Sequence, residues 1–207
     1  MANAKLDKRM IALMQAAAKA AVWRGSITYQ EAVKKTLSAG GASNIGQGGR
    51  SSQPGGPPAV KTGMLRRSFG VNGPGSINEI RDGGLTVRIG TNLPYARIQE
   101  YGGIIRPVNV KALPVPIGVE GQRVMREFGG DLRRADLTYI PRKGKDPLLV
   151  RMIGKGKNAR MQVLFVLKQS VRLPARPYMR PTVKLARSSM QREAQIGARR
   201  VMGGGMA

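Results

Sequence analysis

The chain has 207 residues, a length that fits one domain with elaborations. It carries 36 Lys and Arg against 11 Asp and Glu, a formal net charge of +25, and this self-repelling balance implies a polyanionic or acidic partner. Nucleic acid meets that requirement through counterion release, and an acidic protein face meets it as well. Cys and His are both absent, which excludes disulfides, ordinary zinc sites, thiol nucleophiles and histidine acid–base chemistry.

The carboxylates are too dispersed to indicate an active site. Glu120, Glu127, Asp131 and Asp136 are near one another in sequence, but they alternate with arginines that they are expected to balance. We therefore expect no enzymatic activity, no catalytic residue, no metal and no cofactor. Aromatic residues make up only 4% of the chain, so platforms for stacking nucleic-acid bases are scarce.

The first 38 residues are expected to form an N-terminal helical segment. Thr28 and Glu31 have capping-box spacing, which predicts that a second, shorter helix follows the first and ends near Gly40. Lysines and Arg9 interrupt the apolar positions of 1–22, a pattern that a signal peptide or membrane span would not tolerate, so synthesis in the cytoplasm and no membrane contact are expected. The first helix is indicated by apolar residues at three- and four-residue spacing: Leu6, Met10, Leu13, Met14, Ala17 and Ala21.

A flexible Gly/Pro-rich arm is predicted over residues 39–60, because this stretch has almost no apolar residue to bury. An α+β core domain is expected over 61–202, with an insertion around 111–168, before a disordered tail at 203–207. Its first expected elements are a turn at 82–84, a strand with Leu85, Val87 and Ile89 on one face, and a short helix from Pro94 to Tyr101. Further strands are expected at 104–110, 113–117, 148–153 and 161–173. The prolines at 114 and 116 favour an edge strand there.

A basic loop and a closing helix complete the expected organisation. The loop forms a candidate basic contact surface made of Arg142, Lys143, Lys145, Lys155, Lys157 and Arg160, which lie among glycines. Pro181 is well placed as the first residue of the last helix, in which apolar residues keep one face and basic residues occupy others.

Three short segments carry a family resemblance when they are taken together. They are QPGGPPAVKTGMLRRSF at 53–69, GTNLPYA at 90–96 with EYGG at 100–103, and LPARPYMRP at 173–181. In this order and ahead of a terminal helix, they resemble the tail-completion and head-tail joining proteins of long-tailed phages, including the virion morphogenesis proteins of Mu-like phages. The resemblance covers roughly residues 53–190.

Within these segments, Leu65 is expected to face inward and to pack with Phe69 on the sheet, while Arg66 and Arg67 face outward. Tyr95 and Tyr101 are expected chiefly to serve core packing. Candidate assembly residues are those of the three motifs: Leu65, Arg66, Arg67, Tyr95, Glu100, Tyr101, Arg176, Tyr178 and Arg180, with Glu100 facing an arginine or a neighbour and Tyr178 as an anchor.

The resemblance implies an α+β fold with a small, mostly antiparallel sheet packed by N-terminal and C-terminal helices. It also implies a structural virion protein of the phage neck, assembled as a homo-oligomeric ring with the six-fold symmetry of the tail tube. The implied partners are portal or adaptor proteins and tail tube or terminator proteins, with packaged DNA as a further contact. Localisation in the virion neck or tail follows from that role.

Two other functions remain open at the level of sequence. One is a tail terminator protein of the same assembly, and the other is a basic nucleic-acid-binding protein, which the charge, the basic loop and the basic terminal helix favour. The second alternative explains the charge but not the three motifs, and the chain has no zinc-finger, zipper or recognition-helix signature.

Overall fold

The computed structural model describes residues 8–40, 54–154 and 159–204. The chain divides into two compact units. The first, which we call the helical unit, comprises the described residues of 1–42, 52–101 and 176–207, and the second, the sheet unit, comprises those of 102–175. Most of the arm expected at 39–60 lies outside the described residues.

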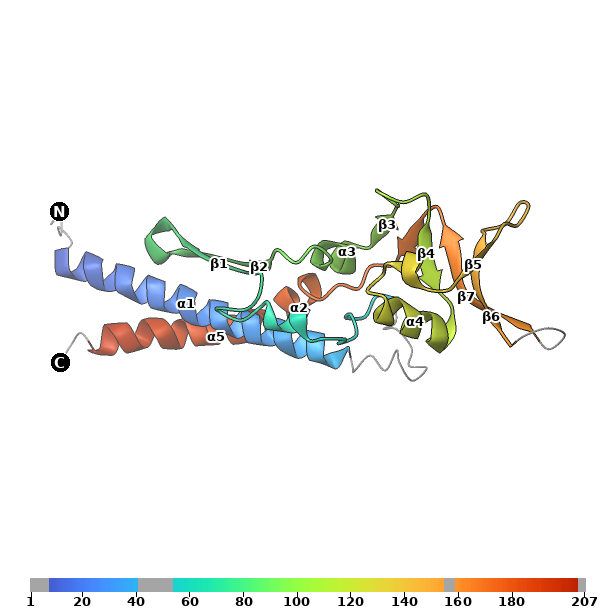
Figure 1. Ribbon diagram of the computed structural model, residues 1–207. Coiled ribbons are helices and arrows are strands. Elements are labelled where there is room, and N and C mark those ends of the chain that lie inside the picture. Colours follow the sequence, from blue (N-terminus) through green and yellow to red (C-terminus); the bar gives the residue numbers. More distant parts are fainter. Residues whose placement is uncertain (1–7, 41–53, 155–158, 205–207) are drawn as a thin grey trace. The chain divides into compact units, whose positions relative to one another are not determined.

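Two long helices, α1 (Lys8–Ala39) and α5 (Arg180–Gly204), pack along each other in the helical unit (Figure 1). The prediction of two N-terminal helices is wrong, because α1 runs without a break through the expected capping box. Thr28 Oγ1 donates a hydrogen bond to the carbonyl oxygen of Arg24, 2.9 Å away. The hydroxyl therefore bonds back within the helix and does not start a new one.

Short elements cover this helix pair: α2 (Met64–Arg67), the antiparallel strands β1 (Ser76–Arg81) and β2 (Thr86–Thr91), and α3 (Ala96–Tyr101). The turn at 82–84, strand β2 and helix α3 confirm the sequence prediction, whereas β1 was not predicted. Leu65 and Phe69 share a buried cluster with side chains of α1, and Ile89 of β2 packs against this cluster. The buried core of this unit consists of Tyr29, Val33, Leu37, Leu65, Phe69, Ala96 and Tyr178.

The sheet unit contains two antiparallel sheets. One pairs β3 (Gly103–Ile105) with β8 (Val171–Leu173), and the other has the order β4 (Leu113–Pro116), β7 (Arg160–Lys168), β6 (Leu148–Ile153), β5 (Thr138–Ile140). Strand β4 lies at the edge, as its prolines predicted, and β6 has the predicted bounds. Helix α4 (Gly118–Glu127) packs against β7, and its Val124 forms a small core with Ala135, Leu164 and Phe165.

These elements confirm the predicted α+β class with small antiparallel sheets. Two details differ from prediction. The strand expected at 104–110 ends at Ile105, and the strand expected at 161–173 is divided into β7 and β8. The short helix η2 (Leu132–Arg134) follows α4.

Candidate functional site

Glu100, near the end of α3, holds the start of α5. Its carboxylate accepts hydrogen bonds from the backbone N–H groups of Tyr178, Met179 and Arg180, at 2.7, 3.0 and 3.1 Å. The first N–H groups of a helix have no acceptor inside the helix, and a negative charge near them is favourable. The side chain is only 3% exposed, so this remote carboxylate acts as a buried cap for α5.

The same junction joins the second and third sequence motifs. The Arg180 Nε lies 3.5 Å from Glu100 Oε1, and its guanidinium carbon lies 4.3 Å from the centroid of the Tyr101 ring. The backbone N–H of Arg176 donates to the carbonyl oxygen of Gln99 at 2.7 Å. Glu100 thus faces an arginine, as the sequence indicated, and it also binds a row of amides that the sequence did not indicate.

Core packing of Tyr95 and Tyr101, the interpretation favoured from sequence, is wrong. The two rings are 39% and 59% exposed. Ala96 and Glu100 lie four residues apart on α3 and take its buried face, which leaves both tyrosines on the outside.

Tyr178 is the buried anchor of the junction. It is 1% exposed, and its ring meets that of Phe69 edge to face, with centroids 5.8 Å apart. Burial, reinforced by the nearby charge of Glu100, raises the pKa of Tyr178 well above its usual value. The same two causes raise the pKa of Tyr29 to about 12, and the Tyr29 hydroxyl donates to the carbonyl oxygen of Met179 at 3.4 Å.

A second candidate surface lies where α2 meets α1. Leu65 is buried, while Arg66 and Arg67 are exposed, as predicted from the first motif. A cleft of about 450 Å³, which we call the basic cleft, is lined by Lys34, Lys35, Ser38, Arg66 and Arg67. Sequence reasoning missed the two lysines and Ser38, because only the packing of α2 on α1 brings them to the arginines.

The basic contact surface proposed from sequence lies in the sheet unit. Arg142, Lys143 and Lys145 are exposed in the turn between β5 and β6, and Arg160 is exposed at the start of β7. Lys155 and Lys157 lie outside the described residues. The Arg142 Nε donates to the carbonyl oxygen of Asp146 at 2.8 Å, so this arginine also stabilises its own turn.

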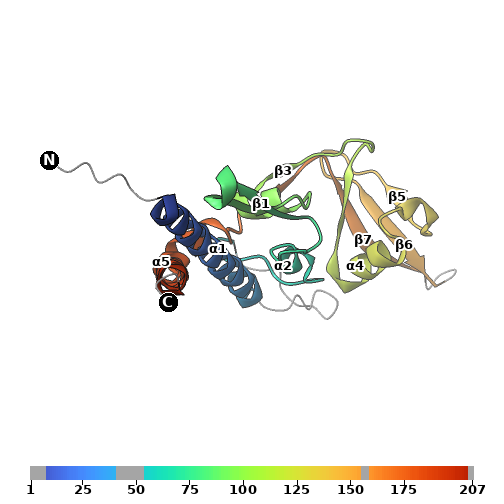
Figure 2. The same cartoon turned by 90° about the vertical axis from the view of Figure 1, so that its left-hand side faces the viewer.

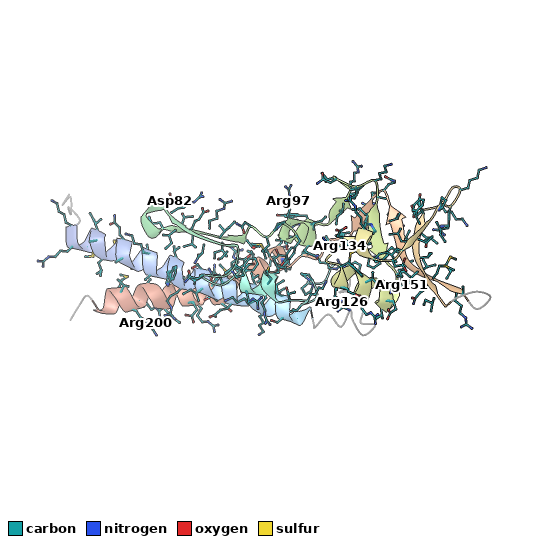
Figure 3. The ribbon with its side chains drawn as sticks, viewed as in Figure 1. Asp82, Arg97, Arg126, Arg134, Arg151 and Arg200 are labelled. Carbon is teal, nitrogen blue, oxygen red and sulfur yellow. The ribbon has the colours of Figure 1, made fainter. Side chains whose placement is uncertain are left out.

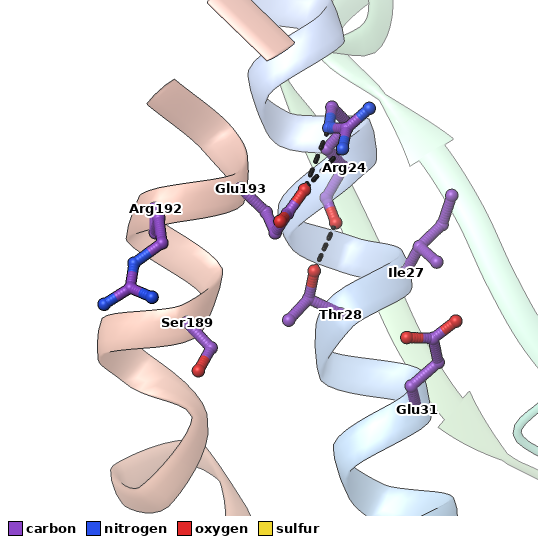
Figure 4. A pocket seen from close by; sticks show the side chains of 7 residues that line it. All are labelled: Arg24, Ile27, Thr28, Glu31, Ser189, Arg192 and Glu193. Atoms are coloured by element: carbon purple, nitrogen blue, oxygen red, sulfur yellow. Dashed lines mark hydrogen bonds and ion pairs between the residues drawn. The ribbon is translucent and has the colours of Figure 1, made fainter. Parts of the chain in front are cut away.

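A cleft of about 510 Å³ between α1 and α5 differs from the basic cleft in its charge balance (Figure 4). Arg24 and Glu193 face each other there, with 3.2 Å between Arg24 Nε and Glu193 Oε2. Glu31 and Arg192 also line it, so the charges of its two positive and two negative side chains cancel.

Positive charge is spread over several elements of both units. The labelled arginines on α3, α4, β6 and α5 show this: Arg97, Arg126, Arg151 and Arg200 (Figure 3).

Among the described residues, no group of three or more acidic, His or Cys side chains is arranged to hold a metal ion. None of the helices in that part of the chain combines the length and apolarity that crossing a membrane requires.

A comparison with known protein families gives a match in the N-terminal part of the chain. Residues 2–102 match the family HK97-gp10_like, described as Bacteriophage HK97-gp10, putative tail-component. Residues 2–102 are therefore similar to this phage tail family. The match confirms the resemblance to phage tail proteins and includes Glu100, but the motif at 173–181 lies beyond it. No curated protein and no solved structure matches the chain.

Proposed function

We propose that this HK97-gp10-like protein is a non-enzymatic tail-completion or head-tail joining subunit that forms a ring in the phage neck. The observation that supports this proposal most directly is the family match, which favours a structural role in the tail region. In the proposed assembly, six copies close around the axis of the tail and contact portal or adaptor proteins on one side and tail tube or terminator proteins on the other.

Exposed apolar side chains of the helical unit support the oligomeric part of the proposal. Leu185 on α5 is 77% exposed, and Ile80 on the β1–β2 hairpin is 60% exposed. The hairpin has two strands, so each strand has an edge without a sheet partner among the described residues. Apolar surface and free strand edges of this kind are buried when identical subunits associate.

Substitution of Leu185 tests whether α5 contributes to contacts between copies. We expect Leu185→Gln to weaken the self-association of the full chain about 10-fold or more, because it removes an apolar side chain from the interface. Arg187→Gln is the matched control, since it places the same new residue on the same helix, about half a turn away, and should leave association within about 3-fold of wild type. Native mass spectrometry over a concentration series measures both.

Equal effects of the two substitutions would contradict a role for Leu185. A wild-type chain that stays monomeric at all concentrations, and that binds neither purified tails nor connector proteins, would overturn the proposed function itself.

A further inference from the structure

We propose that the basic cleft binds the phosphodiester backbone of DNA without regard to base sequence. The cleft was defined above by Lys34, Lys35, Ser38, Arg66 and Arg67. This proposal goes beyond assembly into a ring, because it assigns a ligand class to one surface of a single chain.

Packing of α2 on α1 builds the cleft. Leu65 and Phe69 share a buried cluster with Val33 and Leu37 of α1, and this cluster fixes the short helix against the C-terminal half of the long one (Figures 1 and 2). Lys34 and Lys35 follow Val33 in sequence, and Arg66 and Arg67 follow Leu65. Ser38 ties the two elements together, because its hydroxyl accepts a hydrogen bond from Arg66 Nη1 at 3.2 Å and donates to the carbonyl oxygen of Lys34 at 2.8 Å.

The cleft gathers four positive side chains, and no carboxylate lines it. None of its four cations belongs to an ion pair among the described residues, whereas Arg24 pairs with Glu193 in the cleft of similar size between α1 and α5. Like charges held close together repel each other and destabilise the folded state. A bound oxyanion removes that repulsion, and Lys and Arg are the side chains that bind phosphate oxygens.

The chemistry of the lining favours DNA over an acidic protein. Charged residues and one serine form the cleft, with no apolar or aromatic residue in it. A protein partner usually anchors in a pocket against apolar or aromatic side chains, and no such residue lines this cleft. Phosphate contacts need only cations and hydrogen-bond donors, and they carry no sequence information. The net charge of +25 adds long-range attraction to a polyanion.

Fluorescence anisotropy with the full chain and a labelled mixed-sequence duplex tests the proposal over a series of salt concentrations. The site variant is K34Q/K35Q/R66Q/R67Q, and the matched control is R106Q/K111Q/R133Q/R172Q, which removes four positive charges from exposed positions in the sheet unit. We expect the site variant to lose about 30-fold or more in affinity and the control less than about 3-fold. The slope of log affinity against log salt should become shallower by about 3.6 if each of the four cations neutralises one phosphate, since each phosphate that the protein no longer neutralises reduces the slope by about 0.9.

A second measurement on the wild-type chain does not depend on how the variants fold. DNA should protect Lys34 and Lys35 from amine acylation, read out by mass spectrometry, more strongly than it protects Lys143 and Lys145. Equal losses in the two variants, or protection confined to the sheet unit, would overturn the proposal. So would competition by polyglutamate as strong as that by unlabelled duplex, because it would indicate an acidic protein as the ligand. A chain that forms rings but does not bind DNA would overturn this inference alone and leave the proposed function standing.

Discussion

At the scale of single residues, Glu100 brings several interactions together around one buried side chain. Three backbone N–H groups, one guanidinium and two buried tyrosines lie around its carboxylate. A buried donor that loses its acceptor retains the cost of desolvation, which makes removal of the acceptor more damaging than an average surface change.

Replacement of this carboxylate should therefore destabilise the helical unit. We expect Glu100→Ala to lower the free energy of unfolding by about 3 kcal/mol, because it leaves three amides at the start of α5 without their acceptor. Glu100→Gln keeps one acceptor oxygen and should fall between Glu100→Ala and wild type. The exposed Glu31 gives the control, and Glu31→Ala should change stability by about 0.5 kcal/mol or less. Urea unfolding measures all three, and equal effects at the two positions would contradict the capping role of Glu100.

Tyr29 makes the stability of the helical unit sensitive to alkaline pH. Its pKa is raised to about 12 in the folded chain, whereas an unfolded tyrosine ionises near pH 10. The unfolded chain therefore releases the proton first, and the stabilisation is complete below about pH 10 and is lost as pH rises towards about 12.

The corresponding substitution should flatten this pH dependence. Between about pH 10 and 12, Tyr29→Phe should lose stability less steeply than wild type, by about 1 kcal/mol per pH unit. Tyr139→Phe, at an exposed position in the sheet unit, should follow the wild-type curve. Urea titrations at several pH values give the comparison, and parallel curves for Tyr29→Phe and wild type would show that the phenol does not titrate as described.

At the scale of elements, the crossing of α1 and α5 depends on small residues. A Cβ added at Gly197 would lie 2.8 Å from the carbonyl oxygen of Ala20 and 2.8 Å from Arg24 Cδ. At Gly203, on the same helix, an added Cβ would have no neighbour within 4 Å. The two helices therefore approach each other closely at one glycine and not at the other.

This difference gives a matched pair of substitutions. Alanine in place of glycine within a helix is favourable by about 1 kcal/mol in propensity. We expect Gly203→Ala to leave the melting temperature unchanged or slightly raised, and Gly197→Ala to lower it by several degrees, because the backbone of α1 must move away. Thermal unfolding followed by circular dichroism tests this, and an increase with Gly197→Ala would exclude the close contact.

Elements with a clear local pattern could be predicted from the sequence. Strand β6, the short helix α3 and the closing helix α5 all have hydrophobic periodicity or turn signals in their own residues. Helix α4 could not be predicted, because its glycines lower its helix propensity. Gly121 is needed there for a tertiary reason, since an added Cβ would collide with the carbonyl oxygen of Leu164.

The residues of the candidate site also fall into two groups, those that a local sequence motif identified and those that it did not. Arg66, Glu100 and Tyr178 were found because each lies within a short motif. The contribution of Lys34 and Lys35 depends on the packing of one helix on another, and a periodic pattern within α1 does not reveal it. The amides bound by Glu100 are 78 to 80 residues further along the chain, so no local signal pairs them.

At the scale of the whole molecule, excess positive charge is the property that most needs a partner. The described ion pairs engage Glu79, Glu100, Glu120, Asp131, Asp146 and Glu193. Since the chain has only 11 Asp and Glu for 36 Lys and Arg, most of its cations have no acidic side chain to balance them. A subunit that works between virion proteins and DNA would find those counter-charges in its surroundings.

The proposed place in the virion is tested most directly by electron cryomicroscopy of intact particles of a phage that encodes this chain. The account predicts density for the helical and sheet units in a ring of six copies between the connector and the tail tube. Purified, infectious particles that lack the chain would contradict it.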